Sequence, residues 1–160
     1  RCHGAYDMKV IYHNRTPNPS VEKELNANYV SFNELLEQSD VLSIHANLSE
    51  ETKGLFNADA FSKMKPSAIF INTARGGLHD EKNLIEALQN HVIWGAGLDV
   101  TNPEPMKKDN PLLSMENVAV TPHIGSATIE ARNEMSRLAA LNIIQFSKGE
   151  PLTNLVSPEI

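Results

Sequence analysis

An arginine, a glutamate and a histidine stand in three separate segments of this 160-residue chain. Arg75 lies directly before a Gly-Gly pair, Glu104 lies between two prolines, and His123 lies directly before an Ile-Gly-Ser sequence. A guanidinium grips a planar carboxylate with two parallel hydrogen bonds. A histidine has a pKa near neutrality and can transfer a proton, while a nearby carboxylate stabilises the imidazolium. These residue types suit acid–base chemistry on a substrate that carries a carboxylate.

Each of these residues, taken alone, also has a structural explanation. A loop arginine more often forms an ion pair, a glutamate between prolines is more often a surface acid in a turn, and a lone histidine is more often structural. Position favours the functional explanation, because ligands of open α/β sheets bind at the carboxyl ends of strands. His123 also precedes a long helical segment, whose N-terminus offers backbone donors.

Five short runs rich in Val and Ile alternate with amphipathic stretches. The runs cover residues 8–12, 41–45, 68–72, 93–100 and 118–121. Short apolar runs of this kind are typical of strands buried on both faces of a parallel sheet. Helix starts are indicated at Ser31, Asn57 and Asp80, and a long helix is expected over 127–147, ending at Gly149. The pattern predicts an α/β fold with a Rossmann-like doubly wound parallel sheet.

The beginning of that fold has no counterpart in the sequence. Gly4 alone does not form a glycine-rich phosphate loop, and Arg1 falls inside the expected first helix. We therefore expect a sheet that is N-terminally incomplete, with its first strand and Gly-rich loop absent, which leaves two unpaired edges. We expect either a longer chain or another segment to complete it.

Composition excludes several classes of function. The formal net charge of −6 argues against nucleic acid or an anionic membrane as the main partner. No apolar run approaches the roughly 20 residues of a membrane span. The single cysteine, Cys2, excludes an internal disulfide framework and fits a reducing cytoplasm. No His-Glu-x-x-His spacing or cysteine cluster indicates a metal site.

The end of the second strand of a dinucleotide-binding fold discriminates between nicotinamide cofactors. An acidic residue there binds the ribose hydroxyls of NAD. Here the strand is followed by Asn14, Arg15 and Thr16, without a carboxylate. Arg15 can pair with a 2′-phosphate that a carboxylate would repel, so we favour NADP over NAD. The alternative is a solvent-facing turn with an incidental arginine.

Three signatures occur in order along the chain: Asn72–Gly76, Gly97–Val100 followed by Glu104-Pro105, and Thr121–Ser126. Together they resemble the D-isomer-specific 2-hydroxyacid dehydrogenase family, over essentially the whole chain. Within the family, the Asn14–Thr16 segment looks most like glyoxylate/hydroxypyruvate reductases. The segment 43–48 departs from the commoner Pro-Leu ending of its strand, and His45 within it is not interpreted as catalytic.

The resemblance implies roles for these residues. Arg75 matches the arginine that binds the substrate carboxylate and polarises its carbonyl, His123 the general acid/base, and Glu104 the carboxylate partner of that histidine. Asp99 matches the residue that holds the nicotinamide carboxamide. Further matches to cofactor-lining positions are Thr73, Ala74, His123, Ile124 and Gly125, and matches to the adenosine-ribose site are Asn14, Arg15 and Thr16.

The resemblance also implies an activity. We expect a cytoplasmic oxidoreductase, a homodimer, that transfers a hydride between NADP or NAD and a small 2-oxo or 2-hydroxy acid. The alternative is a non-catalytic corepressor or scaffold that senses nicotinamide dinucleotides. Residues 1–148 are expected to form the nucleotide-binding domain and 149–160 a tail that returns toward a substrate domain. Without that domain, the 160 residues alone are expected to be inactive.

Overall fold

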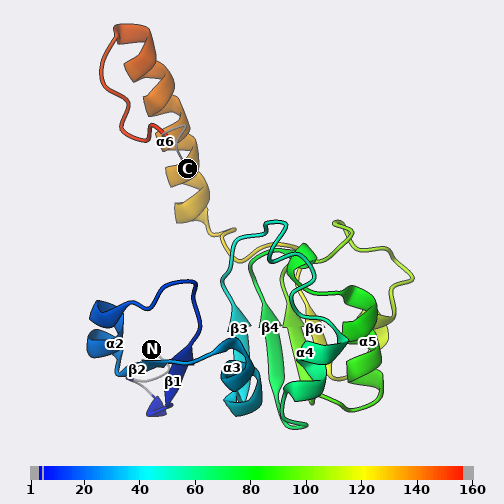
Figure 1. Cartoon of the computed structure of the whole chain (residues 1–160). Coiled ribbons are helices and arrows are strands. Elements are labelled where there is room, and N and C mark those ends of the chain that lie inside the picture. The colour runs from blue at the N-terminus through cyan, green and yellow to red at the C-terminus, as the bar shows by residue number, and fades with distance from the viewer. Residues whose placement is uncertain (1–3, 5, 157–160) are drawn as a thin grey trace. The chain divides into compact units, whose positions relative to one another are not determined.

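Figure 1 shows a computed structural model, which describes residue 4 and residues 6–156. The chain divides into two compact units, Arg1–Pro122 and His123–Ile160, and each is described by itself. The expected start inside a first helix, the cysteine at position 2 and the end of the C-terminal tail lie outside the described residues. A domain boundary after residue 148 stays a prediction.

A four-stranded parallel sheet forms the centre of the first unit. Its strands, in spatial order, are β3 (Val41–Ile44), β4 (Ile69–Asn72), β5 (Gly95–Leu98) and β6 (Val118–Val120). The connections contain α4 (Ala58–Lys63), η1 (Gly76–Leu78), α5 (Glu81–Gln89) and η2 (Pro111–Ser114). The predicted α/β architecture with parallel strands is confirmed, and each strand lies within its predicted run.

A separate two-stranded parallel sheet precedes it. Strands β1 (Val10–Tyr12) and β2 (Ala27–Tyr29) are joined by helix α2 (Pro19–Leu25). Within the part of the chain that the structure describes, no ladder joins these strands to the four-stranded sheet. The described residues therefore form two sheets where one was expected. Neither α2 nor β2 was anticipated.

Side-chain caps fix the predicted helix starts. At α3 (Phe32–Gln38), the Ser31 hydroxyl accepts from the Glu34 backbone while the Glu34 carboxylate accepts from the Ser31 backbone, a capping box. Asn57 caps α4 and Asp80 caps α5 through their side-chain oxygens. These bonds satisfy backbone donors that have no partner inside a helix, so the three predicted starts are confirmed.

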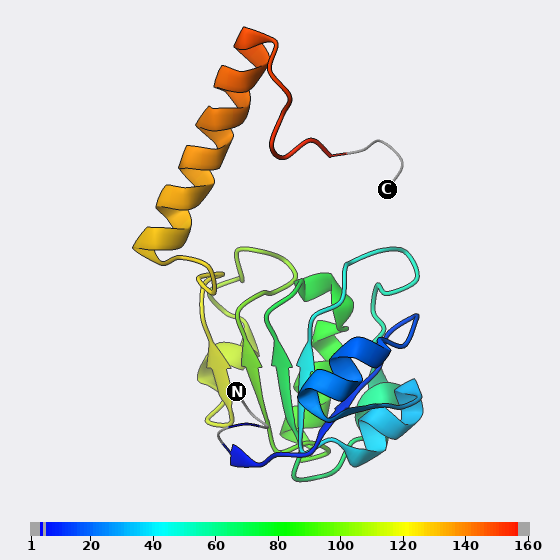
Figure 2. The ribbon, with the colours of Figure 1, turned by 90° about the vertical axis from the view of Figure 1, so that its left-hand side faces the viewer.

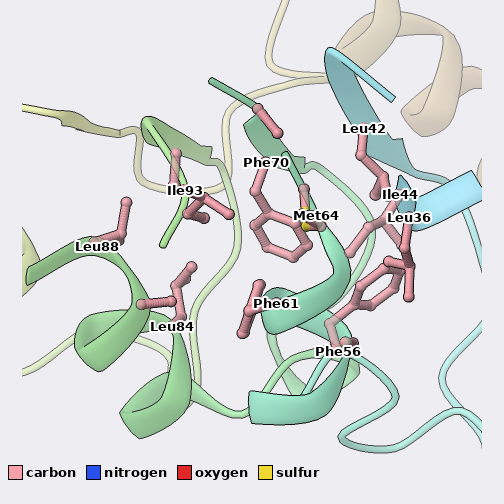
Figure 3. Packing of buried hydrophobic residues seen from close by; sticks show 14 of the residues in the cluster. Leu36, Leu42, Ile44, Phe56, Phe61, Met64, Phe70, Leu84, Leu88 and Ile93 are labelled. Carbon is pink, nitrogen blue, oxygen red and sulfur yellow. The ribbon is translucent and has the colours of Figure 1, made fainter. Parts of the chain in front are cut away.

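The hydrophobic core lies between the four-stranded sheet and the helices that precede and follow β4, as Figure 3 shows. The Phe70 ring from β4 meets the rings of Phe56 and Phe61 edge-on, at centroid distances of 5.3 and 5.2 Å. Edge-to-face pairs of this kind add to the stabilisation from burial. The core therefore anchors β4 and, with it, the segment that carries Arg75.

The second unit contains the long helix α6 (Ile129–Lys148). It begins two residues later than predicted, because the Thr128 side chain caps it by accepting from Ala131. Gly149 ends it at φ 66°, in the left-handed region that glycine adopts without strain. The chain then runs back along the helix, as Figure 2 shows, and its Thr153 backbone donates to Gln145. Among the described helices, none is long and apolar enough to cross a membrane.

Candidate active site

The strands of the four-stranded sheet end level with one another. Their register pairs the last residues in a row: Ile44, Asn72, Leu98 and Val120. We call this line of strand ends the carboxyl edge. Arg75 follows β4 and Glu104 follows β5, so both leave the sheet at this edge, where open α/β sheets bind ligands.

Asn72, the last residue of β4, holds the turn that carries Arg75. Its side chain is fully buried and accepts a hydrogen bond from the Ala74 backbone N–H at 3.0 Å. Its amide nitrogen donates to the Arg75 carbonyl at 2.9 Å and lies 3.0 Å from Nδ1 of His79. The Arg75 side chain itself is exposed. The turn is thus held at its base, while the exposed guanidinium donates to the Ala74 carbonyl at 2.6 Å.

Gly76 brings the Arg75 turn against the segment that leads to Glu104. A Cβ atom built on Gly76 would lie 2.0 Å from the carbonyl oxygen of Thr101. Only glycine permits so close an approach of two backbones. The Thr101 hydroxyl in turn donates to the Pro103 carbonyl at 2.9 Å, next to Glu104. The structure therefore brings the segments of Arg75 and Glu104 together at the carboxyl edge.

We predict that Gly76→Ala lowers the free energy of unfolding by about 3 kcal/mol or more, because the methyl group would collide with backbone. Gly77→Ala is the matched control. A Cβ there would meet the Leu48 side chain at 3.1 Å, and that exposed side chain can move. We expect a loss of about 1 kcal/mol or less from the control. Urea denaturation measures both, and equal losses would contradict the proposed backbone contact.

Asp99 links three strands at the same edge. It is buried, and its backbone N–H donates to the Asn72 carbonyl at 2.9 Å. The Thr121 hydroxyl, just after β6, donates to the Asp99 carboxylate at 2.6 Å. The carboxylate group is thereby held near the strand ends of β4, β5 and β6, as expected for a residue that orients a ligand there.

A pocket of about 500 Å³ opens between the segments that follow β3 and β4. Its lining residues are His45, Ala46, Asn47, Leu48, Ala74 and Arg75. The sequence interpretation assigned Ala74 and Arg75 to the site but named no site residue in the 45–48 segment. Its position directly after a strand was the available signal. Lining a pocket gives His45 no catalytic role, and its ring nitrogen is already 2.9 Å from the Ser43 hydroxyl.

The expected adenosine-ribose residues follow β1. Asn14, Arg15 and Thr16 are all exposed, and the Asn14 carbonyl accepts from the Tyr29 hydroxyl at 3.0 Å. The pKa of Glu51 is lowered, first by the hydroxyl of Ser49 and in smaller part by the positive charge of Arg15. Arg15 is exposed, so its guanidinium is accessible to an anionic ligand.

His123 begins the second compact unit. Its backbone has φ 53°, in the left-handed region. Ile124 and Gly125 follow, and the Ile124 carbonyl accepts from Ala127 at 2.9 Å, ahead of the Thr128 cap. Because each unit is described by itself, the meeting of His123 with Arg75 and Glu104 stays a prediction.

Metal chemistry has no candidate ligand set in residues 4 and 6–156. No three side chains of His, Cys, Asp or Glu cluster there closely enough to hold an ion. His79, which follows the Arg75 turn in the chain, is buried, and its Nδ1 lies 3.0 Å from the Asn72 amide nitrogen.

Comparison with known proteins identifies the family. The family model of the D-isomer specific 2-hydroxyacid dehydrogenase NAD binding domain matches residues 1–125. The chain belongs to this family. The resemblance based on the three sequence signatures is confirmed, and the family assignment agrees with the carboxyl-edge position of Arg75, Asp99 and Glu104.

Family members of known name resemble the chain over nearly its whole length. It is 46% identical over 160 residues to glyoxylate/hydroxypyruvate reductase B of Klebsiella pneumoniae subsp. pneumoniae, covering 100% of the chain and 50% of that protein. It is 46% identical over 155 residues to glyoxylate reductase of Thermococcus litoralis, covering 97% and 46%. A structure of D-lactate dehydrogenase with NAD+ from Lactobacillus jensenii superposes with TM-score 0.87 at 34% identity, covering 96% and 50%. The chain thus spans about half the length of these relatives.

Proposed function

We propose that the protein carrying this chain is an oxidoreductase that transfers a hydride between a nicotinamide dinucleotide and a small 2-oxo or 2-hydroxy acid. The observation that carries the proposal is the rigid Arg75 turn, held against the Thr101–Glu104 segment at the carboxyl edge. The names of the family relatives, glyoxylate/hydroxypyruvate reductase B and glyoxylate reductase, make glyoxylate and hydroxypyruvate the first substrates to test.

The proposed roles follow from the charge that develops during reaction. Arg75 binds the substrate carboxylate and polarises the adjacent carbonyl. His123 delivers the proton that the carbonyl oxygen needs once it becomes an alkoxide, and Glu104 stabilises the imidazolium and fixes its tautomer. In the reverse direction, His123 accepts the hydroxyl proton. Hydride delivery is the chemistry that a bound nicotinamide supplies.

The residues present fit such a cofactor. Asp99 is buried at the carboxyl edge with its carboxylate held by Thr121, a suitable partner for a carboxamide N–H group. Thr73 and Ala74 lie on the Arg75 turn, and Ala74 lines the pocket. We assign these residues to cofactor binding together with the segment His123, Ile124 and Gly125.

We further propose that NADP is preferred over NAD. The segment Asn14–Thr16 after β1 has no carboxylate, and the exposed Arg15 can pair with a 2′-phosphate.

Arg15→Ala is expected to weaken NADPH binding about tenfold or more while leaving NADH binding nearly unchanged, because the lost pair is specific to the 2′-phosphate. Cofactor titration followed by fluorescence measures both dissociation constants. Lys82→Ala is the matched control, since Lys82 is an exposed cation with an 84% exposed side chain on α5. Equal weakening of NADPH and NADH by Arg15→Ala would contradict the assignment.

Oxidation of NADPH, followed by its absorbance with glyoxylate or hydroxypyruvate in the full-length protein, tests the function. Turnover supports the proposal. Cofactor binding without turnover on any 2-oxo acid contradicts it and favours a sensor of nicotinamide dinucleotides.

We also propose a homodimer in the cytoplasm, as the family resemblance implies. Light scattering that gives the mass of a monomer would contradict the dimer, and fractionation of cells tests the location.

A further inference from the structure

His79 is a buried histidine to which the proposed mechanism gives no role. His79 is 2% exposed and directly follows η1. On either side of it, the Leu78 carbonyl accepts from the Phe56 backbone N–H and the Asp80 backbone N–H donates to the Phe56 carbonyl. Its ring packs edge-on against Phe70 at 5.8 Å. Burial lowers the pKa of His79 to about 4, and the nearby Asp80 charge opposes this only in part. The ring is therefore neutral at pH 7, with one nitrogen that can accept a hydrogen bond.

The Asn72 amide connects this ring to the Arg75 turn. Two of its contacts reach the turn, because its oxygen accepts from the Ala74 N–H and its nitrogen donates to the Arg75 carbonyl. The second N–H of the same nitrogen points to Nδ1 of His79, at 3.0 Å. Nδ1 must then be the unprotonated nitrogen, and the proton is on Nε2. Nε2 is buried without a hydrogen-bond partner among the described residues.

We propose that His79 is a positioning residue for Arg75, acting through Asn72. The neutral ring offers the one acceptor that completes the hydrogen bonding of the Asn72 amide. An apolar residue at position 79 would leave one buried N–H of the Asn72 amide without an acceptor. A protonated imidazole would place its own Nδ1–H against that N–H, and two donors repel each other. The amide would then rotate away from the turn. His79 thus fixes the backbone from which the Arg75 guanidinium reaches its ligand.

The consequence for substrate rests on the proposed function. A carboxylate and its adjacent carbonyl must both meet the guanidinium at hydrogen-bond distance, and a displacement of about 1 Å can cost 10²-fold in rate. Loosening the turn should therefore affect the 2-oxo acid more than the cofactor, whose proposed contacts also include Asp99 and Arg15.

The test compares His79→Leu with His79→Asn in the full-length protein. Leucine keeps apolar packing but removes the acceptor, whereas asparagine returns a carbonyl oxygen close to the position of Nδ1. We expect His79→Leu to lower kcat/KM for the 2-oxo acid about 10–100-fold with little change in the KM for the cofactor. We expect His79→Asn to recover at least part of the loss. A folded His79→Leu protein with unchanged kcat/KM would overturn the proposal.

A second measurement does not depend on activity. The Ala74 amide should exchange its hydrogen about tenfold or more faster in His79→Leu than in the unsubstituted protein, and His79→Asn should restore slower exchange. Unchanged exchange would overturn the positioning role. If the unsubstituted protein oxidised no NADPH with any 2-oxo acid, but His79→Leu still exchanged the Ala74 amide hydrogen faster, the positioning role of His79 would stand. The proposed function would then be refuted instead.

If His79→Leu does not fold, the tautomer of His79 in the unsubstituted protein provides an independent test. Nitrogen NMR of the unsubstituted protein should show a neutral ring protonated on Nε2 from about pH 5.5 to 8, because burial opposes the charged form. A ring protonated on Nδ1, or an imidazolium at pH 7, would overturn the proposal.

Discussion

Replacing His123 with alanine should lower kcat for reduction of a 2-oxo acid by about 10²–10⁴, the range typical of a lost general acid/base. The alkoxide oxygen formed by hydride transfer needs a proton, and without the imidazole only water can supply it. Substrate binding should change less, because Arg75 supplies the main contact with the carboxylate. Steady-state kinetics with NADPH and glyoxylate or hydroxypyruvate measures both parameters.

The control for this variant is His91→Asn. His91 is exposed between α5 and the amino end of β5, away from the carboxyl edge, and asparagine tolerates its φ of 54°. We expect unchanged kcat in the control. An unchanged kcat in His123→Ala would contradict the assignment of His123 as the general acid/base.

Arg75→Ala should lower kcat/KM by about 10²–10³ or more, with both a higher KM for the 2-oxo acid and a lower kcat. The same guanidinium is proposed to bind the carboxylate in the ground state and to stabilise charge on the carbonyl oxygen in the transition state. Arg75→Lys should have a kcat/KM between those of the unsubstituted protein and Arg75→Ala, because an ammonium keeps the charge but not the paired donors.

Arg137→Ala is the matched control for Arg75. Arg137 is an exposed arginine on α6 that pairs with Glu134 at 2.6 Å. Exposed ion pairs of this kind contribute little to stability, so Arg137→Ala should remain folded and keep its kinetic parameters. If Arg75→Ala changed the KM for the cofactor and left that for the 2-oxo acid unchanged, Arg75 would be a cofactor residue and the proposed substrate contact would be wrong.

Of the two elements that sequence reasoning missed, β2 depends on non-local pairing and α2 does not. β2 has three residues and no Val or Ile, and it is a strand because its backbone pairs with β1 in parallel register. Helix α2 did leave a local signal. Asn18 caps it, Pro19 occupies its first turn, and Asn26 ends it at φ 49°. Caps of this kind can be recognised in sequence, whereas a three-residue strand cannot.

The family, the parallel α/β class and the capped helix starts could all be read from the residues alone. Caps involve residues three apart in the chain, and a buried strand shows itself as an apolar run, so both are local in sequence. The contacts around Arg75 are not local. That Gly76 lies against Thr101, that Thr121 holds Asp99, and that Asn72 and His79 share a buried hydrogen bond follow only from the folded chain. Such contacts arise where the carboxyl ends of neighbouring strands meet, and only the tertiary structure places residues so far apart in sequence at the same strand ends.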